Sequence, residues 1–383
     1  MNSFEPSAAD MAQVIKEFLP AYRQRYKLSA EQASVCQSIL QCQTEALGGE
    51  PVQCSDCGYE QVLYHSCGNR HCPRCKQRAS QQWEEKQLDA LLPVRYYHLV
   101  FTLPHEFNGW CQLHPKAMYG LLFRAVWQTL SRFSQSHKRL NGQLGSTCVL
   151  HTWGQNLQQH VHMHCLIPGL ALKSGQDSIE STNSDYLYPV NALKKVYRGK
   201  LVSLLRQAWQ KGLLFRITHP NEVNDILSQV MAKSWSVYIR PCIEKPQTVV
   251  KYLSRYTYRI AISNSRIVAV KQGMVYFRWK DYANNHQQKI MALKGVEFLR
   301  RFLMHVLPNG FMRIRHYGFL ANCVRKAKLA MIRTLMKVQA ISIAVMNNRP
   351  SDSIKTVLCQ CPVCHKGVMQ PGYAMATVKK RRR

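Results

Sequence analysis

Three histidines stand on alternating residues in "HVHMHCLIPG", residues 160–169. A β-strand sends every second side chain to one face, so His160, His162 and His164 would point the same way. Three imidazoles pack poorly in an apolar core, but neutral imidazole is a common metal ligand. The spacing therefore predicts a metal ion held on a strand.

A fourth histidine precedes this strand in "STCVLHTW", and "GQNLQQ" separates the two segments. If that linker is a hairpin loop, Trp153 faces His160, and His151 lies opposite His162 and beside His164. Ligands on two neighbouring strands leave the remaining coordination positions open, as in a catalytic metal site. We expect His162 and His164 as ligands, and His151 or His160 as the third.

A pair of tyrosines follows in "VVKYLSRYTYRIA", which predicts a helix. Tyr252 and Tyr256 stand one turn apart on the same face, with Arg255 and Arg259 on the adjacent flank. Arginine binds phosphate oxygens, and a phenol can act as a nucleophile. Because a phenol has a pKa of about 10, little of the nucleophilic phenolate is present at neutral pH. The arginines would favour the phenolate, and a divalent cation on the scissile phosphate, Mg²⁺ or Mn²⁺, would polarise the phosphorus.

Cysteines are dense in "CSDCGYEQVLYHSCGNRHCPRC", residues 54–75. Cys54, Cys57, Cys72 and Cys75 form two Cys-x-x-Cys pairs, which can complete a tetrahedral zinc site with no open position. Such closed sites are structural. The sequence therefore predicts a structural Zn²⁺ in this block.

Further candidate ligands and cations lie between and after these pairs. Cys67 and His71 could replace a member of either pair, or join Cys36 or Cys42 in a second site. Arg70, Arg74 and Lys76 would let the block touch DNA phosphates, or would only brace the fold.

A last cysteine group, "CQCPVCH" at residues 359–365, is too compressed for a tetrahedral site of its own. A metal ion there would need a ligand from elsewhere in the chain.

Composition favours a polyanionic partner. Against 21 Asp and Glu there are 52 Lys and Arg, a net charge of +31, which favours nucleic acid through counterion release. The sequence shows neither a membrane-length apolar run nor an export signal, so we expect a cytoplasmic protein. Several of its fifteen cysteines stand in Cys-x-x-Cys pairs, which favours metal binding over disulfides.

The surrounding pattern predicts an α+β protein with a basic helical C-terminal region. Predicted helices cover the first 50 residues, 79–93, 115–139, 189–212, 245–261 and much of 291–345. Predicted strands are 95–104, 146–153, 160–172, 234–242 and a pair turning at Gly273. We divide the chain into an N-terminal helical and zinc-binding domain (1–92), a catalytic domain (93–290) and a C-terminal region (291–383).

Together these motifs resemble the HUH endonucleases, and more narrowly the two-tyrosine rolling-circle transposases of bacterial insertion sequences, the IS-ninety-one group. The resemblance rests on "YHSCGNRHCPRC", "YYHLVFTLP", "HTWGQNLQQHVHMHCLIPG", "YLSRYTYRIAISNSRI" and "FRWKDY", in that order. It implies an antiparallel sheet of ferredoxin-like or palm-like type with helices on one face and the histidine strand central. A zinc-ribbon-like module would precede it.

The same resemblance implies the chemistry. Tyr252 and Tyr256 match paired nucleophiles that leave a 5′-phosphotyrosine and a free 3′-hydroxyl, and His162 and His164 match the metal ligands. One departure is that Gly169 precedes Leu170 where the family often has a second glycine, which bears on the loop and not on the chemistry.

The expected partner is DNA, single-stranded element ends and target, on the bacterial nucleoid. The alternatives are a plasmid replication initiator or relaxase with the same chemistry, and a noncatalytic zinc-ribbon regulator whose histidines merely brace the sheet.

Overall fold

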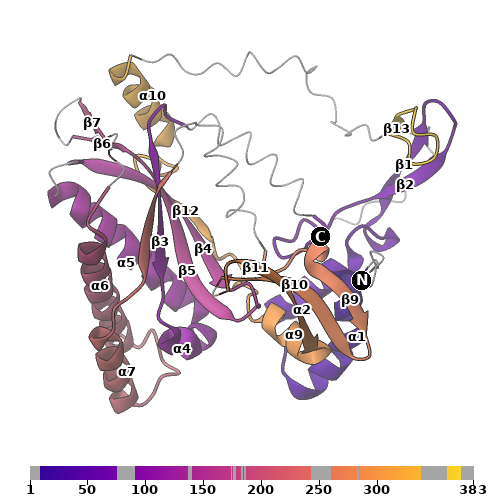
Figure 1. Ribbon diagram of the computed structural model, residues 1–383, viewed down its shortest axis with the longest axis horizontal. Coiled ribbons are helices and arrows are strands. Elements are labelled where there is room, and N and C mark those ends of the chain that lie inside the picture. The colour runs from indigo at the N-terminus through magenta and orange to yellow at the C-terminus, as the bar shows by residue number, and fades with distance from the viewer. Residues whose placement is uncertain are drawn as a thin grey trace.

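The computed structural model describes residues 9–75, 91–136, 140–173, 175, 178–182, 184, 187–242, 260–282, 284–337 and 360–371. They form a mixed α+β fold whose largest element is a curled antiparallel sheet (Figure 1). This confirms the predicted fold class.

The seven-stranded sheet places the histidine strand near its centre. Its strands are β3 (Tyr96–Thr102), β4 (Gln143–Trp153), β5 (Gln159–Pro168), β6 (Leu170–Leu172), β7 (Ile179–Ser181), β8 (Val237–Cys242) and β12 (Ile314–Gly318). The order is β7-β6-β4-β5-β3-β8, and β12 also pairs with β4. Strand β5 therefore lies between β4 and β3 and pairs with both.

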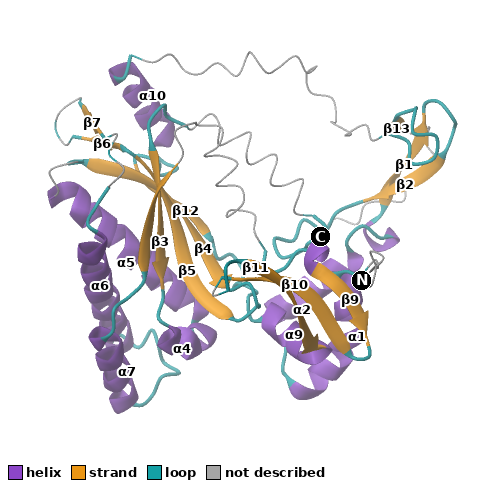
Figure 2. Ribbon diagram, in the orientation of Figure 1, coloured by secondary structure: helices purple, strands orange, loops and turns teal. Residues whose placement is uncertain are grey.

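Helices cover one face of this sheet (Figure 2). They are α4 (Asn108–Leu113), α5 (Pro115–Ser136), α6 (Val190–Gln210) and α7 (Pro220–Ala232). From β5, Val161, Met163 and Cys165 point into this helical layer and are almost fully buried. Burial of such a side chain contributes about 1.5–3 kcal/mol, so the apolar residues decide which way the histidines between them point.

A second core joins segments that are distant in the sequence. Helices α1 (Met11–Arg25), α2 (Ala30–Gln41) and α9 (Gly295–Leu303) pack with the sheet β9 (Ile267–Lys271), β10 (Met274–Asp281) and β11 (Gln287–Lys294). The predicted strand pair at Gly273 is confirmed, and Gly273 has φ +72°.

This second core draws residues from all three predicted domains, because Ile15, Trp153, Phe277 and Phe298 share it. The domain boundaries stay a prediction. The packing shows that the three segments do not have separate cores.

A small three-stranded sheet extends away from the larger one (Figure 1). It consists of β1 (Gly49–Cys54), β2 (Glu60–Tyr64) and β13 (Met369–Pro371), in the order β13-β1-β2. Short 3-10 turns at Glu45–Leu47, His105–Phe107 and Asn264–Arg266 and helix α10 (Arg325–Leu335) complete the described elements.

Strand β12 was not predicted, because the sequence indicated helix through this region. Residues 314–318 pair antiparallel with β4, from Ile314 opposite Val149 to Gly318 opposite Gly145. Every residue of β12 is half-buried, which means that neither face of the strand is clearly the core side. The sequence accordingly lacks the apolar alternation that marks a strand. The predicted helices at 79–93 and 245–261 lie almost entirely outside the described residues.

The close approach of β12 to β4 depends on Gly318, which has φ +62°. A Cβ atom there would stand 1.6 Å from the carbonyl oxygen of Leu144, whereas a Cβ at Gly310, with φ +68°, would meet nothing within 4 Å. We expect Gly318→Ala to lower the free energy of unfolding by about 1–3 kcal/mol more than Gly310→Ala. Urea denaturation of both variants measures this, and equal losses would contradict it.

Candidate active site and metal centres

The hairpin of β4 and β5 sets the register of the histidines. His151 pairs with His162, as the sequence predicts. The predicted pairing of Trp153 with His160 is wrong, because the register shifts and Trp153 pairs with Gln159. The turn is one residue shorter than expected, spanning residues 154–158, with Leu157 at φ +62°.

Three of the four candidate histidines converge. The ligand nitrogens of His151, His162 and His164 lie within 4.8 Å of one another. Ring centroids are 4.5 Å apart for His151 and His164 and 4.8 Å for His162 and His164. His151 is 2% exposed and His164 9%, while His162 is half-buried. The cluster is therefore anchored in the sheet and accessible from one side.

His160 is not part of this group. Its side chain is exposed, and its ring centroid lies 4.9 Å from that of His162, toward the hairpin turn. On β4, Trp153 stacks on His151 at 4.8 Å and occupies the next position along the strand. Between the two predicted candidates for the third ligand, the geometry favours His151.

Hydrogen bonds orient the rings of the cluster. Nδ1 of His162 lies 2.8 Å from the carbonyl oxygen of His160, so this nitrogen is the protonated donor and Nε2 keeps its lone pair. Nδ1 of His164 lies 2.9 Å from Nε2 of His98 on β3. Burial, and then the charge of Arg240, lowers the pKa of His98 to about 4, so His98 is neutral at pH 7.

Together His98, His151, His162 and His164 define what we call the histidine face, the side of the seven-stranded sheet opposite the helices. Sequence reasoning missed His98, whose signal was a lone histidine inside the aromatic strand "YYHLVF". In the strand register His98 stands opposite Arg240 of β8. Nε of Arg240 donates a hydrogen bond to the hydroxyl of Tyr238 over 2.7 Å.

The predicted nucleophiles and their flanking arginines, Tyr252, Tyr256, Arg255 and Arg259, lie outside the described residues. The chain on either side is described. Before them, β8 pairs with β3 in the histidine sheet, and after them Ala261 and Ile262 pack in the second core with Trp153.

Among the described residues, eight cysteines form two clusters of four, and the predicted single site of Cys54, Cys57, Cys72 and Cys75 is wrong as a grouping. The hairpin of β1 and β2 carries Cys54 and Cys57 to its turn, whereas the chain after β2 returns to the end of α2. The two Cys-x-x-Cys pairs are thereby separated.

The first sulfur cluster comprises Cys42, Cys67, Cys72 and Cys75. The Sγ atoms of Cys42 and Cys75 are 3.2 Å apart, and those of Cys67 and Cys75 are 3.4 Å apart. Of the two predicted alternatives, Cys67 joins this cluster. His71 does not, since its Nε2 accepts a hydrogen bond from the backbone of Leu307. Burial raises the pKa of Cys36, which stays outside, to about 11.

The second sulfur cluster comprises Cys54, Cys57, Cys361 and Cys364. The compressed C-terminal group thus finds ligands elsewhere in the chain, as predicted for a metal there. Backbone N–H groups, first that of Cys57, lower the pKa of Cys54 to about 6, which favours the thiolate that binds metal.

Arg70 and Arg74 of the cysteine block make hydrogen bonds to other parts of the protein. Arg70 donates to the carbonyl oxygen of Pro308 over 3.0 Å. Arg74 donates to the carbonyl oxygen of Cys42 over 2.7 Å and pairs with Asp10. These contacts favour bracing over DNA contact for both. Lys76 lies outside the described residues.

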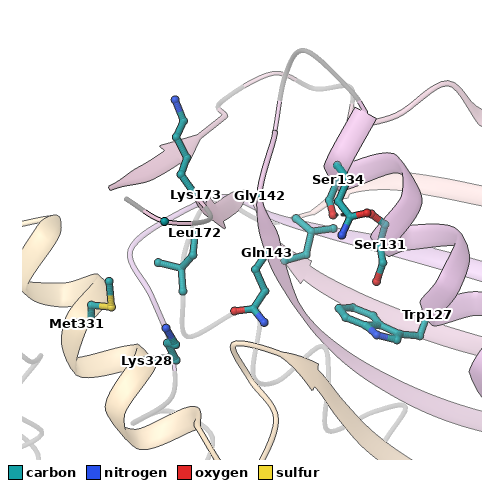
Figure 3. A pocket seen from close by; sticks show the side chains of 12 residues that line it. Trp127, Ser131, Ser134, Gly142, Gln143, Leu172, Lys173, Lys328 and Met331 are labelled. Atoms are coloured by element: carbon teal, nitrogen blue, oxygen red, sulfur yellow. Dashed lines mark hydrogen bonds between the residues drawn. The ribbon is translucent and has the colours of Figure 1, made fainter. Parts of the chain in front are cut away.

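A separate pocket lies between α5, β4 and α10 (Figure 3). Trp127, Gln143, Lys173 and Lys328 are among its lining residues, and none of the described residues that line it is a histidine or a cysteine. It therefore lacks the acid, base or metal-ligating groups found on the histidine face.

Two family models and a relative of nearly the same extent match this chain. A family model described as "Putative transposase" matches residues 145–328, and one described as "Transposase zinc-binding domain" matches residues 14–103. The "Putative transposase y4qJ" of Sinorhizobium fredii (strain NBRC 101917 / NGR234) is 38% identical over 376 residues, 95% of this chain and 94% of the relative.

Two further matches are more distant. The transposase for insertion sequence element IS801 of Pseudomonas savastanoi pv. phaseolicola is 27% identical over 304 residues, 75% of this chain and 69% of the relative. A solved conjugative relaxase TrwC, copper-bound and in complex with oriT DNA, covers 60% of this chain and 97% of its own, at 11% identity and a TM-score of 0.26.

The family matches define a DNA-processing enzyme. The chain belongs to the IS91-type family of insertion-sequence transposases with an N-terminal zinc-binding domain, as its motifs predicted. Across the described residues, no helix combines the length and apolar character of a membrane span.

His305 fixes the hairpin that carries the histidines. Its Nδ1 accepts from the hydroxyl of Thr152 over 3.2 Å, and its Nε2 donates to the carbonyl oxygen of Leu157 over 3.0 Å. Burial lowers the pKa of His305 from 6.5 to about 4. The imidazole is therefore neutral in the folded protein down to acidic pH.

This shift predicts a pH dependence of stability. Between pH 6.5 and 4 this histidine binds a proton in the unfolded chain but stays neutral in the folded protein. Protonation therefore stabilises the unfolded state, and the free energy of unfolding falls as the pH falls. We expect His305→Gln to reduce this slope by about 1 kcal/mol per pH unit. Urea denaturation from pH 7 to 5 measures it. Parallel curves for wild type and His305→Gln would contradict the assignment.

Proposed function

We propose that this DNA transposase is a metal-dependent single-strand endonuclease and strand transferase of the HUH type, which cuts DNA by tyrosine attack. The observation that carries the proposal is the convergence of His151, His162 and His164 on the histidine face. The apolar residues of β5 between them fill the helical side of the sheet, so that core does not require the imidazoles.

The donor set fits a divalent cation. Nε2 of His162 carries a lone pair because Nδ1 donates to a carbonyl. In the tautomer in which Nδ1 of His164 donates to Nε2 of His98, Nε2 of His164 likewise carries a lone pair for a metal. Three protein ligands with an accessible side are typical of a catalytic site. A bound Mg²⁺ or Mn²⁺ would polarise the scissile phosphate and offset its developing charge.

The remaining chemistry belongs to the tyrosine segment. The phenolic oxygen of Tyr252 or Tyr256 attacks phosphorus, and its proton passes to solvent. The bond from phosphorus to the 3′ oxygen breaks, which leaves a 5′-phosphotyrosine and a free 3′-hydroxyl once that oxygen takes up a proton. Arg255 and Arg259 favour the phenolate and bind phosphate oxygens. A second tyrosine allows a second transfer without release of the DNA.

Chain connectivity supports this role for the tyrosines. Strand β8, which precedes them, lies beside β3 with Arg240 opposite His98 on the histidine face. Ala261 and Ile262, which follow them, share a core with Trp153, the residue that stacks on His151. The chain that follows the tyrosines therefore returns to the core that contains the neighbour of a candidate metal ligand.

The substrate that we propose is single-stranded DNA at the element ends and at the target, met on the nucleoid. The net charge of +31 favours a polyanion. Membership of the insertion-sequence transposase family favours transposition over plasmid replication or transfer. For structural zinc, we propose the first sulfur cluster as the site within the zinc-binding domain.

Removal of one ligand tests the metal site. We expect His162→Ala to slow cleavage of a single-stranded element end at least about 100-fold, because a metal ion supplies several kcal/mol of charge stabilisation in the transition state. DNA affinity should change little, since the positive charge of the chain is untouched. Gel assays of cleavage and fluorescence anisotropy of binding measure the two quantities.

The neighbouring His160→Ala is the matched control, because His160 lies on the same strand outside the cluster. It should cleave within a few-fold of wild type. Joint loss of binding and cleavage in His162→Ala would instead indicate a purely structural histidine.

A covalent adduct tests the nucleophiles. Incubation with single-stranded element-end DNA and Mn²⁺ should give a protein–DNA adduct, which mass spectrometry of the tyrosine peptide locates at Tyr252 or Tyr256. The double variant Tyr252→Phe/Tyr256→Phe should form none. Tyr258→Phe, which the helical spacing places away from the pair, should react normally. An adduct that persists in the double variant would refute the assignment.

A further inference from the structure

The second sulfur cluster is built from opposite ends of the chain. Cys54 and Cys57 follow β1, and Cys361 and Cys364 precede β13. Sγ of Cys54 lies 3.7 Å from Sγ of Cys364, and Sγ of Cys57 lies 3.7 Å from Sγ of Cys361. Each thiol therefore faces one from the distant segment.

The two Cys-x-x-Cys turns have matching backbone geometry. In the first, the N–H groups of Asp56 and Cys57 point at Sγ of Cys54, at 3.4 and 3.5 Å. In the second, the N–H of Val363 points at Sγ of Cys361 at 3.4 Å. Backbone N–H groups aimed at sulfur stabilise a thiolate, the form that binds metal.

The residue that follows each Cys-x-x-Cys turn has a left-handed backbone conformation in both turns. Gly58 has φ +72° and His365 has φ +54°. A left-handed conformation is uncommon outside glycine and carries strain, so His365 holds it only where the surroundings require it. The second turn thus repeats the first even at an unfavourable residue.

Strand pairing fixes the two turns against each other. Cys54 pairs with Met369, and the N–H of Ser55 donates to the carbonyl oxygen of Val368 over 3.0 Å. A Cβ at Gly367 would lie 2.4 Å from Sγ of Cys54, so only glycine allows the C-terminal backbone to come this close.

Apolar burial contributes little to this small sheet in the part of the chain that the structure describes. Its buried apolar cluster consists of Val52, Cys54, Cys361 and Met369. A core of this size is too small to hold three strands in register, and small modules of this kind need a metal or disulfides. The Sγ separations of 3.7 Å exceed the roughly 2.05 Å of a disulfide bond.

We infer that Cys54, Cys57, Cys361 and Cys364 bind a second structural zinc ion, which clamps the C-terminal segment onto the N-terminal hairpin. Four thiolates with no open position suit Zn²⁺ in a closed tetrahedral site. This ion is distinct from the one proposed for the first sulfur cluster, and it has no part in phosphoryl transfer.

Zinc content of the purified full-length chain tests the inference. Elemental analysis and native mass spectrometry should show that Cys361→Ser/Cys364→Ser loses one zinc ion per chain relative to wild type. Cys42→Ser/Cys75→Ser should lose a different one, and a variant of both pairs should lose two. Cys323→Ser, which removes an exposed cysteine outside both clusters, should lose none.

A conservative variant separates ligation from folding. Cys364→His should keep the zinc ion, because imidazole also binds zinc in a tetrahedral site, whereas Cys364→Ala should lose it. His162→Ala should leave it in place. Unchanged zinc content in Cys361→Ser/Cys364→Ser would overturn the inference. A wild-type mass lowered by the hydrogens lost in disulfides between these segments, without bound zinc, would overturn it as well.

Discussion

The two-residue period of strand β5 is the constraint on which the candidate site depends. Val161, Met163 and Cys165 must face the helices because their burial stabilises the sheet, and the residues between them must then face the other way. A slip of one residue would bury the histidines against α5 and α6 and expose the apolar side chains. Core packing and ligand placement are thus one property of the same ten-residue strand, Gln159–Pro168.

Neutral histidines support the strands that carry the ligand cluster. Burial lowers the pKa of His98, His305 and His316 to about 4. Each has a hydrogen-bond partner, on His164, Thr152 and Thr147 respectively. A neutral imidazole can sit in a dry interior and still offer one donor and one acceptor, which fixes its neighbours without adding to a chain that is already strongly basic.

The cysteine-rich parts are organised by a different principle. Their sheet is small and its outer strand β2 is largely exposed, so burial of apolar surface contributes little there. Sulfur clusters take over that role and tie together segments that are far apart in sequence. Cys42 on the end of α2 meets Cys67 to Cys75, and Cys54 and Cys57 meet Cys361 and Cys364. The N-terminal hairpin is therefore complete only with residues near the C-terminus.

The sequence by itself determined whatever depends on local spacing. Alternation predicted the histidine strand, the short linker predicted the hairpin and the pairing of His151 with His162, and the Cys-x-x-Cys pairs predicted thiolate sites. Only the tertiary structure decided what depends on residues far apart in the chain. In the folded chain the cysteines lie in two separate clusters, and Arg70 and Arg74 donate hydrogen bonds to carbonyl oxygens of the protein. His98 and strand β12 lie beside the histidine strands, which the sequence did not predict. The physical reason is that backbone geometry fixes where near neighbours point, whereas packing of the whole chain fixes which distant groups meet.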